Sequence, residues 1–286
     1  MILAYLKFAP FYLFSLLPFR IMYRFSELAY LVLCYTVGYR KKVVMQNLRD
    51  SFPEKGEEEI RVLARSFYLY FCDVWLETNK LLTISRYNMK RRMTVVNPEL
   101  IEQYAREKRS VILYSAHAGN WEWMISLPLH LPPQVTAFYK PLSSDWFDHY
   151  MQVVRTRFGV LTIPSDRGYR TLSEMALKDQ FTASIVVGDQ RPPRTPDLFR
   201  TGFLHRNTPF LEGAERMAVR LNQAAVFAKI TRTSRGHYQM EFIPIYDGQE
   251  NITRGTLTSR YAALLEQAIR ETPWMWLWSH RRWKHC

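Results

Sequence analysis

Short apolar runs alternate with amphipathic patterns through the middle of the chain. The runs predict strands at 110–117, 135–140, 160–164 and 184–189, and the patterns between them predict helices near 120–129, 144–158 and 168–178. A regular alternation of strands and helices is typical of a mostly parallel sheet that helices cover on both faces. The pattern therefore predicts an α/β fold.

The last third of the chain continues this pattern without a repeat or a flexible linker. Thr208 and Pro209 predict the cap and first turn of a helix that runs to about Asn222, because proline is favoured at the first helical position. Residues 43–286 are therefore expected to form one domain around a mixed, mostly parallel sheet. The other elements expected there are strands 224–233 and 237–246 and a helix near 256–271.

Residues 57–82 repeat apolar side chains at helical spacing and predict one long amphipathic helix. Two carboxylates, Asp73 and Glu77, lie close to its apolar stripe. Charged residues on a helix are usually solvated or paired in salt bridges. This interpretation leaves both carboxylates outside any functional site.

The first 42 residues contain two apolar runs, 2–17 and 28–39, with Pro18 and Arg20 between them. Each run is shorter than the roughly 20 residues that a helix needs to cross a bilayer. Two arrangements stay open: one tilted span, or a pair of interfacial helices with aromatic anchors. Residues 1–42 are expected to anchor the chain to a membrane. The basic residues 40–42 favour the cytoplasmic face for the domain that follows.

The composition narrows the choice of partners. The chain carries a formal net charge of +13 over 286 residues, which indicates an anionic partner. Nucleic acid is not expected, because the charge is spread along the chain and no nucleic-acid-binding motif is found. An anionic lipid, a phosphorylated glycolipid or an acidic acyl carrier fits better. Three widely spaced cysteines, Cys34, Cys72 and Cys286, argue against a disulfide framework.

The segment from His117 to Glu122 combines a base with a carboxylate at the end of a predicted strand. An imidazole takes up a proton near neutral pH, and a carboxylate on its other ring nitrogen would fix the tautomer and stabilise the imidazolium. Since the pair includes no nucleophile, the substrate would bring a hydroxyl that attacks an acyl donor. A hydrogen-bonded structural histidine is the alternative interpretation.

Other polar residues also follow predicted strands, at the carboxyl ends where ligands collect in α/β sheets. His117, Lys140 and Asp189 all lie at such ends, so the fold predicts that they converge. Lys140 would bind a phosphate or a developing oxyanion, or else lie on the surface. Asp189 and Gln190 would hold a neighbouring loop or bind the polar head of a substrate, although Asp189 is also a typical turn residue.

The C-terminal segment, residues 273–284, places four tryptophans beside basic residues. This combination is typical of a membrane-interface element. A segment packed on the core with a basic tip is the alternative. The tryptophans are Trp274, Trp276, Trp278 and Trp283.

Together these segments resemble the late acyltransferases of lipid A biosynthesis, within the superfamily of glycerolipid acyltransferases that share a His-x4-Asp/Glu motif. His117 to Glu122 resembles the family signature. Tyr139-Lys140-Pro141 resembles the second family block, and Gly188-Asp189-Gln190 resembles the third. Because segments 47–54 and 273–284 also resemble family segments, the resemblance spans most of the chain.

The resemblance implies a membrane-associated O-acyltransferase of lipopolysaccharide biosynthesis on the cytoplasmic face of a bacterial inner membrane. It implies that His117 is the general base and that Glu122 orients it. The donor would be an acyl thioester of acyl-carrier protein or coenzyme A, with no other cofactor and no metal. The oxyanion would be stabilised by the backbone amides of Gly119, Asn120 and Trp121, with Lys140 or Arg157. The alternative for Arg157 is a cation at a helix C-terminus.

Two other functions stay open. Arg191 and two prolines follow Gln190, where many lipid A enzymes have a second acidic residue after Asp-Gln. A lysophospholipid or an aminolipid is therefore an alternative acceptor for the same chemistry. A non-catalytic protein that binds membranes through its basic and aromatic surfaces is the other alternative.

Overall fold

A seven-stranded sheet forms the centre of the molecule in the computed structural model, which describes residues 2–193, 195 and 197–284. Its strands are β1 Met93–Val95, β2 Val111–Ser115, β3 Gln134–Tyr139, β4 Leu161–Pro164, β5 Thr182–Val187, β8 Ala224–Ser234 and β9 His237–Tyr246. They lie in the order β1-β9-β8-β2-β5-β3-β4. The strands from β8 to β4 run parallel to one another, while β9 is antiparallel to β8 and parallel to β1. The predicted mostly parallel mixed sheet is confirmed.

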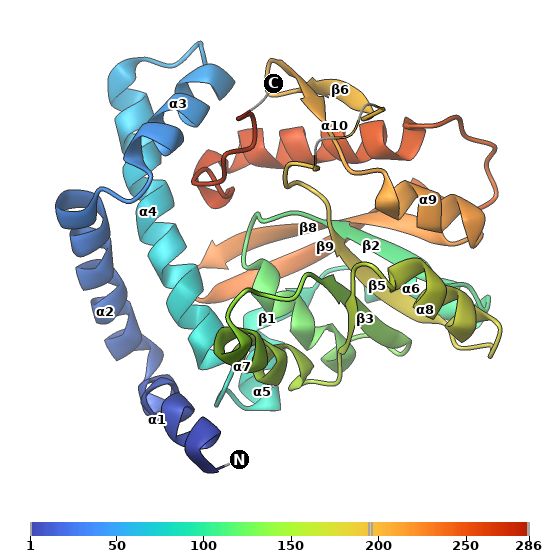
Figure 1. Cartoon of the computed structure of the whole chain (residues 1–286), viewed down its shortest axis with the longest axis horizontal. Coiled ribbons are helices and arrows are strands. Elements are labelled where there is room, and N and C mark those ends of the chain that lie inside the picture. The colour runs from blue at the N-terminus through green and yellow to red at the C-terminus, as the bar shows by residue number, and fades with distance from the viewer. Residues whose placement is uncertain (1, 194, 196, 285–286) are drawn as a thin grey trace.

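Helices cover both faces of this sheet (Figure 1). All five residues of strand β2 are buried, which explains its largely apolar sequence. Val111 and Leu113 pack into one core, and Ile112 and Tyr114 pack into the other. The first core involves α5 Arg86–Arg92, α6 Pro98–Arg106, the 3-10 helix η2 Trp121–Leu129 and α7 Asp145–Thr156, and the second involves α8 Gly168–Ala176, α9 Gly213–Arg220 and α10 Thr256–Glu271.

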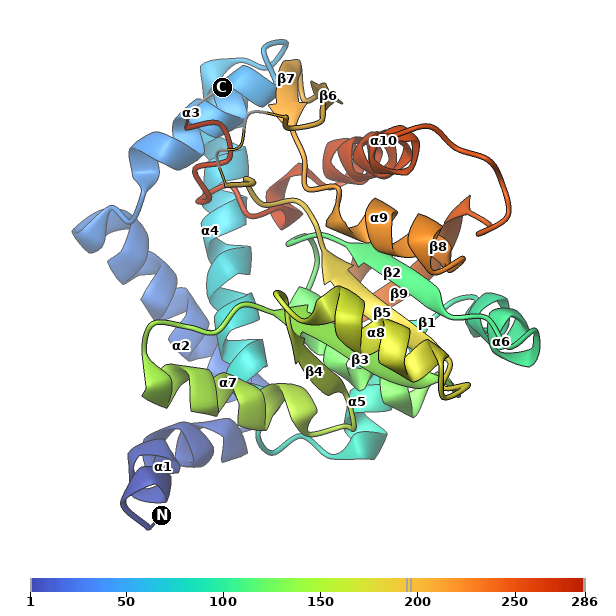
Figure 2. The same ribbon diagram turned by 45° about the vertical axis from the view of Figure 1, so that its right-hand side comes forward.

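The N-terminal helices form a layer of their own along one side of the molecule (Figures 1 and 2). They are α1 Ile2–Leu16, α2 Phe19–Leu31, the π-helix η1 Val32–Val37 and α3 Lys41–Ser51, and they are followed by the long α4 Glu57–Lys80. Pro18 precedes α2 as its N-cap and so separates the first two helices. No helix in the described part of the chain is long and apolar enough to cross a membrane.

The expected helix from Thr208 to Asn222 is wrong at its start. Thr208 and Pro209 close strand β7 Arg206–Pro209, which pairs with β6 Arg200–Phe203 in a separate two-stranded ribbon. Pro209 fits there because it ends a strand that has β6 as its only neighbour in the ribbon. The helix, α9, begins at Gly213.

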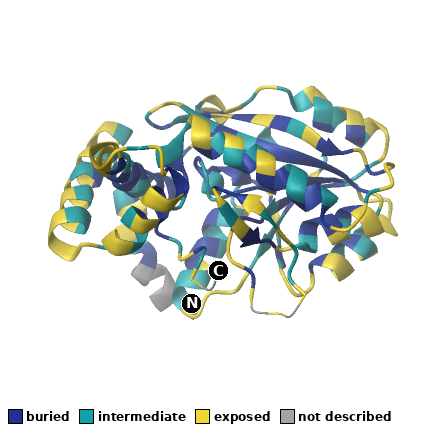
Figure 3. Cartoon of the chain, turned by 90° about the horizontal axis from the view of Figure 1, so that it is seen from above, coloured by how far each residue is buried: buried dark blue, intermediate teal, exposed yellow. Residues whose placement is uncertain are grey.

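The remaining expected elements are present with shifts of a few residues at their ends, and the burial of the sheet explains their clear signal. Figure 3 shows the strands largely buried beneath helices whose outer faces are exposed. The segment after His117 is a 3-10 helix with Pro128 inside it. Cys34 and Cys72 are free thiols, and Cys286 lies outside the described residues.

Candidate active site

The register of two neighbouring strands brings His117 and Asp189 together. Strands β2 and β5 are parallel and adjacent, with Ser115 paired to Val187 at their carboxyl ends. His117 lies two residues beyond Ser115, and Asp189 lies two residues beyond Val187. The predicted convergence of His117 and Asp189 at this edge of the sheet is confirmed.

Asp189 holds the His117 ring through one ring nitrogen. Its Oδ1 lies 2.7 Å from His117 Nδ1, and its Oδ2 accepts the backbone N–H of His117 at 3.0 Å. An ionised carboxylate only accepts hydrogen bonds, so Nδ1 carries the proton in the neutral ring and Nε2 presents a lone pair. The side chain of His117 is 18% exposed, so the ring is partly accessible from the rim.

The carboxylate of Asp189 is itself buried and accepts a third hydrogen bond. Trp276 donates its indole N–H to Oδ2 at 2.8 Å. Burial alone would raise the pKa of Asp189, but the adjacent His117 ring and the hydrogen bonds from His117 and Trp276 hold that pKa below its usual value. Asp189 therefore stays ionised and fixes the ring of His117 in one tautomer.

Glu122 does not make the expected contact with His117. Its two carboxylate oxygens accept hydrogen bonds from Arg155 of α7, at 2.7 and 3.1 Å. The left-handed backbone at Gly119 (φ +64°) and the 3-10 turn that begins at Trp121 direct Glu122 toward that helix. The expected pairing is therefore corrected: the carboxylate on the His117 ring belongs to Asp189, and Glu122 links the turn to α7.

Gly119 is required by conformation and by space. Besides its positive φ, a Cβ at this position would lie 2.4 Å from Cγ2 of Ile230. The backbone N–H of Gly119 donates to the Met275 carbonyl at 3.2 Å, and that of Trp121 donates to the Gly119 carbonyl at 3.1 Å. Since both amides are engaged, the expectation that they form an oxyanion hole does not match this conformation.

Asn120 lies beneath the turn and belongs to a buried polar network. Its amide donates to Glu77 Oε2 at 2.7 Å, and Tyr238 donates to the same oxygen at 2.7 Å. Tyr23 of α2 donates to Glu77 Oε1 at 2.8 Å. Burial raises the pKa of Glu77 to about 7, although hydrogen bonds from the tyrosines and the charge of Arg232 oppose this shift. Asn120 therefore supports the turn from within and does not face a substrate.

Asp73, one turn before Glu77 on α4, anchors the same region through charge. It is 1% exposed and forms salt bridges with Arg232 at 2.8 Å and Arg235 at 2.7 Å. Ser26 of α2 also donates to it at 2.6 Å. The salt-bridged interpretation of Asp73 is confirmed, whereas Glu77 lies in the polar network under the turn that follows His117. A continuous polar connection thus runs from α2 to the turn that carries His117.

Three further side chains surround His117. The ring of Trp121 stands edge-on to the imidazole, with 5.1 Å between centroids, and Gln190 Nε2 lies 3.1 Å from His117 Nε2. Burial lowers the pKa of the nearby His280 to about 4, against the attraction of Asp189, so His280 stays neutral around neutral pH. The imidazole of His117 is therefore the group at this edge that is both accessible and held by a carboxylate.

Lys140 and Arg157 do not lie against His117. Lys140 is exposed directly after β3, the strand that neighbours β5. Arg157 caps α7 and donates to the Leu81 carbonyl at 2.6 Å. The helix-terminal interpretation of Arg157 is thus the one that the structure supports. Lys140 remains at the rim of the sheet edge.

The C-terminal tryptophans are mostly structural. Trp276 and Trp278 are 2% and 0% exposed and meet ring to ring, which favours the packed alternative over an interface element for this part of the segment. Sequence reasoning did not connect Trp276 with Asp189. The local pattern contains no signal for that contact, because 87 residues separate the two side chains.

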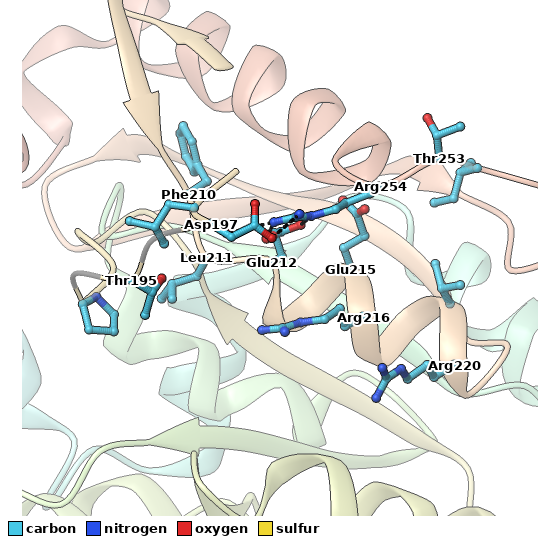
Figure 4. Close-up of a pocket in the computed structure, with 14 residues that line it drawn as sticks. Thr195, Asp197, Phe210, Leu211, Glu212, Glu215, Arg216, Arg220, Thr253 and Arg254 are labelled. Carbon is cyan, nitrogen blue, oxygen red and sulfur yellow. Dashed lines mark hydrogen bonds and ion pairs between the residues drawn. The ribbon is translucent and has the colours of Figure 1, made fainter. Parts of the chain in front are cut away.

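A separate cleft of about 580 Å³ opens beside α9, where the loop after Gln190 continues. Arg254 crosses it and pairs with Asp197 and Glu212 at 2.6 Å each. Figure 4 shows Arg216 and Arg220 projecting from α9 beside this network. The lining combines these charged side chains with apolar ones, among them Leu198, Phe210 and Leu211.

An imidazole held in this way can act as a general base toward a substrate that brings its own nucleophile. Among the described residues, the side chains that hydrogen-bond to the His117 ring or form a ring pair with it are Asp189, Gln190 and Trp121, none of which is a nucleophilic Ser, Thr or Cys. A family profile described as bacterial lipid A biosynthesis acyltransferase matches residues 1–285. The chain therefore belongs to the bacterial lipid A biosynthesis acyltransferase family. A search of curated proteins gave no match.

Family membership makes the chain an acyltransferase that acts on lipid A. It also implies a lipid acceptor and an acyl donor as partners. The fold agrees with this class, because it places a histidine and a carboxylate at the carboxyl edge of a parallel sheet.

Proposed function

We propose that this protein transfers a fatty acyl chain from a thioester to a hydroxyl of a lipid A precursor, with His117 as the general base. The contact that supports this proposal best is the 2.7 Å approach of Asp189 to His117 Nδ1. It leaves Nε2 to take the proton of the acceptor hydroxyl. Asp189 acts as a positioning residue, because it holds the tautomer and stabilises the imidazolium that forms.

The reaction proceeds through one tetrahedral intermediate. The acceptor oxygen loses its proton to His117 Nε2 and forms a bond to the thioester carbonyl carbon. The intermediate then collapses, the carbon–sulfur bond breaks, and the departing thiolate takes the proton from the imidazolium. No covalent acyl-enzyme forms, and His117 returns to its starting state.

Gln190 is the side chain best placed to stabilise the oxyanion. Its amide nitrogen lies 3.1 Å from His117 Nε2 in the free protein. When the acceptor hydroxyl binds at Nε2, this amide is released to donate to the developing negative charge. Lys140, exposed at the next strand end, suits a phosphate on the acceptor.

Glu122 has a supporting role in this proposal. Its pairing with Arg155 ties the catalytic turn to α7, and the polar network around Glu77 ties the same turn to α4 and α2. With two such attachments the His117 backbone is held in place before substrate binds. Preorganisation of this kind lowers the cost of reaching the transition state.

The donor carrier and the membrane side belong to the same proposal. An acyl-carrier-protein thioester fits the net charge of +13, because an acidic carrier is attracted to a basic protein. The N-terminal layer suits interfacial binding on the cytoplasmic face of an inner membrane. Its exposed apolar residues include Leu13, Leu16, Ile21, Phe25, Leu28, Leu31, Val32, Tyr35 and Val37, and exposed basic residues 40–42 follow them.

The test of the reaction uses wild type and His117→Ala in detergent micelles. Each protein receives an acyl-carrier-protein thioester with a tetra-acylated lipid A precursor or, in parallel, with a lysophospholipid. Transfer to the lipid A precursor that depends on His117 supports the proposal. Transfer to the lysophospholipid alone supports that lipid as the acceptor in place of the lipid A precursor. Absence of transfer to both, by a folded protein, overturns the proposed reaction.

The test of the membrane face is flotation with vesicles that contain anionic lipid. Leu28→Glu, in the middle of the apolar row, is expected to weaken binding by at least tenfold, because burial of a leucine is lost and a charge is added. Leu177→Glu is the matched control, since Leu177 is 88% exposed at the end of α8. Equal flotation of both variants would contradict this orientation.

A further inference from the structure

A narrow groove between α1, α4 and α7 has a lining that is almost entirely carbon. It measures about 320 Å³. Its lining includes Phe11 and Phe14 from α1, Trp75 and Leu76 from α4, and Phe147, Tyr150 and Met151 from α7. Trp75 is 52% exposed, an unusual position for the largest apolar side chain. A groove of this chemistry suits a hydrocarbon ligand.

The groove is built by specific contacts and is not a gap between loosely packed helices. Lys80 donates to the Ser15 and Leu17 carbonyls at 2.6 and 2.9 Å, and Thr83 donates to the Ser15 carbonyl at 2.6 Å. Asn79 donates to the Phe11 carbonyl at 3.1 Å. These four bonds fasten the second half of α1 to the end of α4.

The polar atoms at the groove form hydrogen bonds with one another, which leaves a surface of carbon atoms. Tyr150 donates its hydroxyl to Asn79 Oδ1 at 2.8 Å. The Phe11 ring packs on the rings of Tyr150 and Trp146, at 5.2 and 5.4 Å between centroids. A ligand in the groove therefore meets aromatic and aliphatic faces.

Two walls of the groove lead toward His117. On α4, Trp75 follows Val74, and Trp121 packs against the cluster of Tyr70 and Val74. The ring of Trp121 in turn stands edge-on to His117. On α7, Met151 lines the groove and Arg155, one turn later, pairs with Glu122. The groove and the turn after His117 are thus joined through α4 and α7.

We infer that this groove binds the fatty acyl chain of the donor thioester and measures its length. The inference rests on the proposed reaction, which requires one acyl chain to extend away from His117. The groove matches a single chain, since its volume lies at the lower end of the range for small-molecule sites. A precursor of lipid A carries several chains and needs a broad apolar face, which the exposed row of α1, α2 and η1 offers.

Chain-length preference tests the inference. Leu76→Trp fills the groove, and Trp75→Ala enlarges it. Each variant receives a mixture of acyl-carrier-protein thioesters from decanoyl to palmitoyl, with one lipid A precursor, and the products are separated by mass spectrometry. Leu76→Trp is expected to lower relative kcat/KM about fourfold for each methylene that no longer fits. Trp75→Ala is expected to shift the preference toward longer chains.

Leu177→Trp is the matched control, because it makes the same exchange at an exposed position outside the groove. A loss of folded protein would lower transfer from all donors equally. It would not shift the chain-length preferences of the two groove variants in opposite directions. The inference is overturned if both groove variants keep the wild-type preference.

A labelling experiment separates the groove from the reaction itself. A donor thioester with a photoreactive group at its chain end is bound to the wild type and irradiated, and the labelled peptides are identified. Labels on α4 and α7 support the groove even without turnover, in which case the proposed reaction alone fails. Labels confined to α2 and η1 overturn the groove.

Discussion

The two sides of the catalytic turn use similar ion pairs for different purposes. On the sheet side, Asp189 holds His117 at 2.7 Å, and on the helix side, Glu122 holds Arg155 at 2.7 Å. An arginine keeps its proton under all ordinary conditions, whereas a histidine exchanges its proton near neutral pH. Only the sheet-side pair can take part in proton transfer. Whether an ion pair can take part in proton transfer therefore depends on how easily its cation loses a proton, and not on the charges alone.

Removal of the sheet-side base is expected to have the largest effect. His117→Ala should lower kcat by about a thousandfold, within the range for loss of a general base. The midpoint of thermal unfolding should change little, because the buried Asp189 keeps its hydrogen bonds from the backbone N–H of residue 117 and from Trp276. Activity and unfolding are measured on the same preparation, with His205→Ala as the control at an exposed turn. Retention of more than a tenth of the activity would remove His117 from the proposed mechanism.

Removal of the charge on Asp189 is expected to have the next largest effect. Asp189→Asn should lower kcat by about a hundredfold or more, because an amide no longer favours the tautomer with Nδ1 protonated. The pH profile of kcat should also move, since the carboxylate stabilises the imidazolium. Trp276→Phe, which removes one hydrogen bond to Asp189, should give a smaller loss of the same kind. A normal pH profile in Asp189→Asn would argue against the positioning role.

On the helix side the expected effect is on stability more than on rate. Glu122→Gln should lower the free energy of unfolding by about 2 kcal/mol, because it leaves Arg155 largely buried without a charged partner. Activity should fall only a few-fold. Urea unfolding of Glu122→Gln, of Arg155→Gln and of the double variant measures the coupling energy between the two residues. A loss of rate as large as that of Asp189→Asn, at unchanged stability, would return Glu122 to the role expected from the sequence.

The pH dependence of stability is expected to depend on Glu77. Its pKa in the folded protein is raised to about 7, so the folded state holds the proton more tightly than the unfolded state. The stabilisation is complete below the ordinary glutamate pKa and is lost as pH rises toward 7, with a size on the order of 3 kcal/mol. Glu77→Gln should flatten this slope in urea unfolding. Glu174→Gln, on the surface of α8, should leave the slope intact, and an unchanged slope in Glu77→Gln would contradict the assignment.

Much of the fold could be predicted because the buried strands have a strong local signal. Strand β2 is buried at both faces, and so are the first four residues of β5 and the first five of β8. The error at Thr208 and Pro209 arose because a proline that ends a ribbon strand has the same local sequence as one that starts a helix. Local pattern does not distinguish these two uses.

The candidate site was predicted in part. His117 and Asp189 were expected at one edge, but the partner of His117 depends on which strands are adjacent, and no local pattern encodes that β5 lies beside β2. The burial of Glu77 also depends on packing from distant segments, since Tyr238 and Tyr23 reach it from β9 and α2. Contacts between distant segments therefore decided the roles of both carboxylates.

The attachment of the C-terminal segment has a consequence for how activity is acquired. Asn47 of α3 donates to the Trp278 carbonyl at 2.8 Å across a sequence separation of 231 residues, and Trp276 in the same segment completes the shell around Asp189. Contacts that close such long loops form late in folding, after helices and neighbouring strands. During refolding, helical signal should return first and acyl transfer last. Catalytic competence thus marks the final step of assembly, when distant ends of the chain meet.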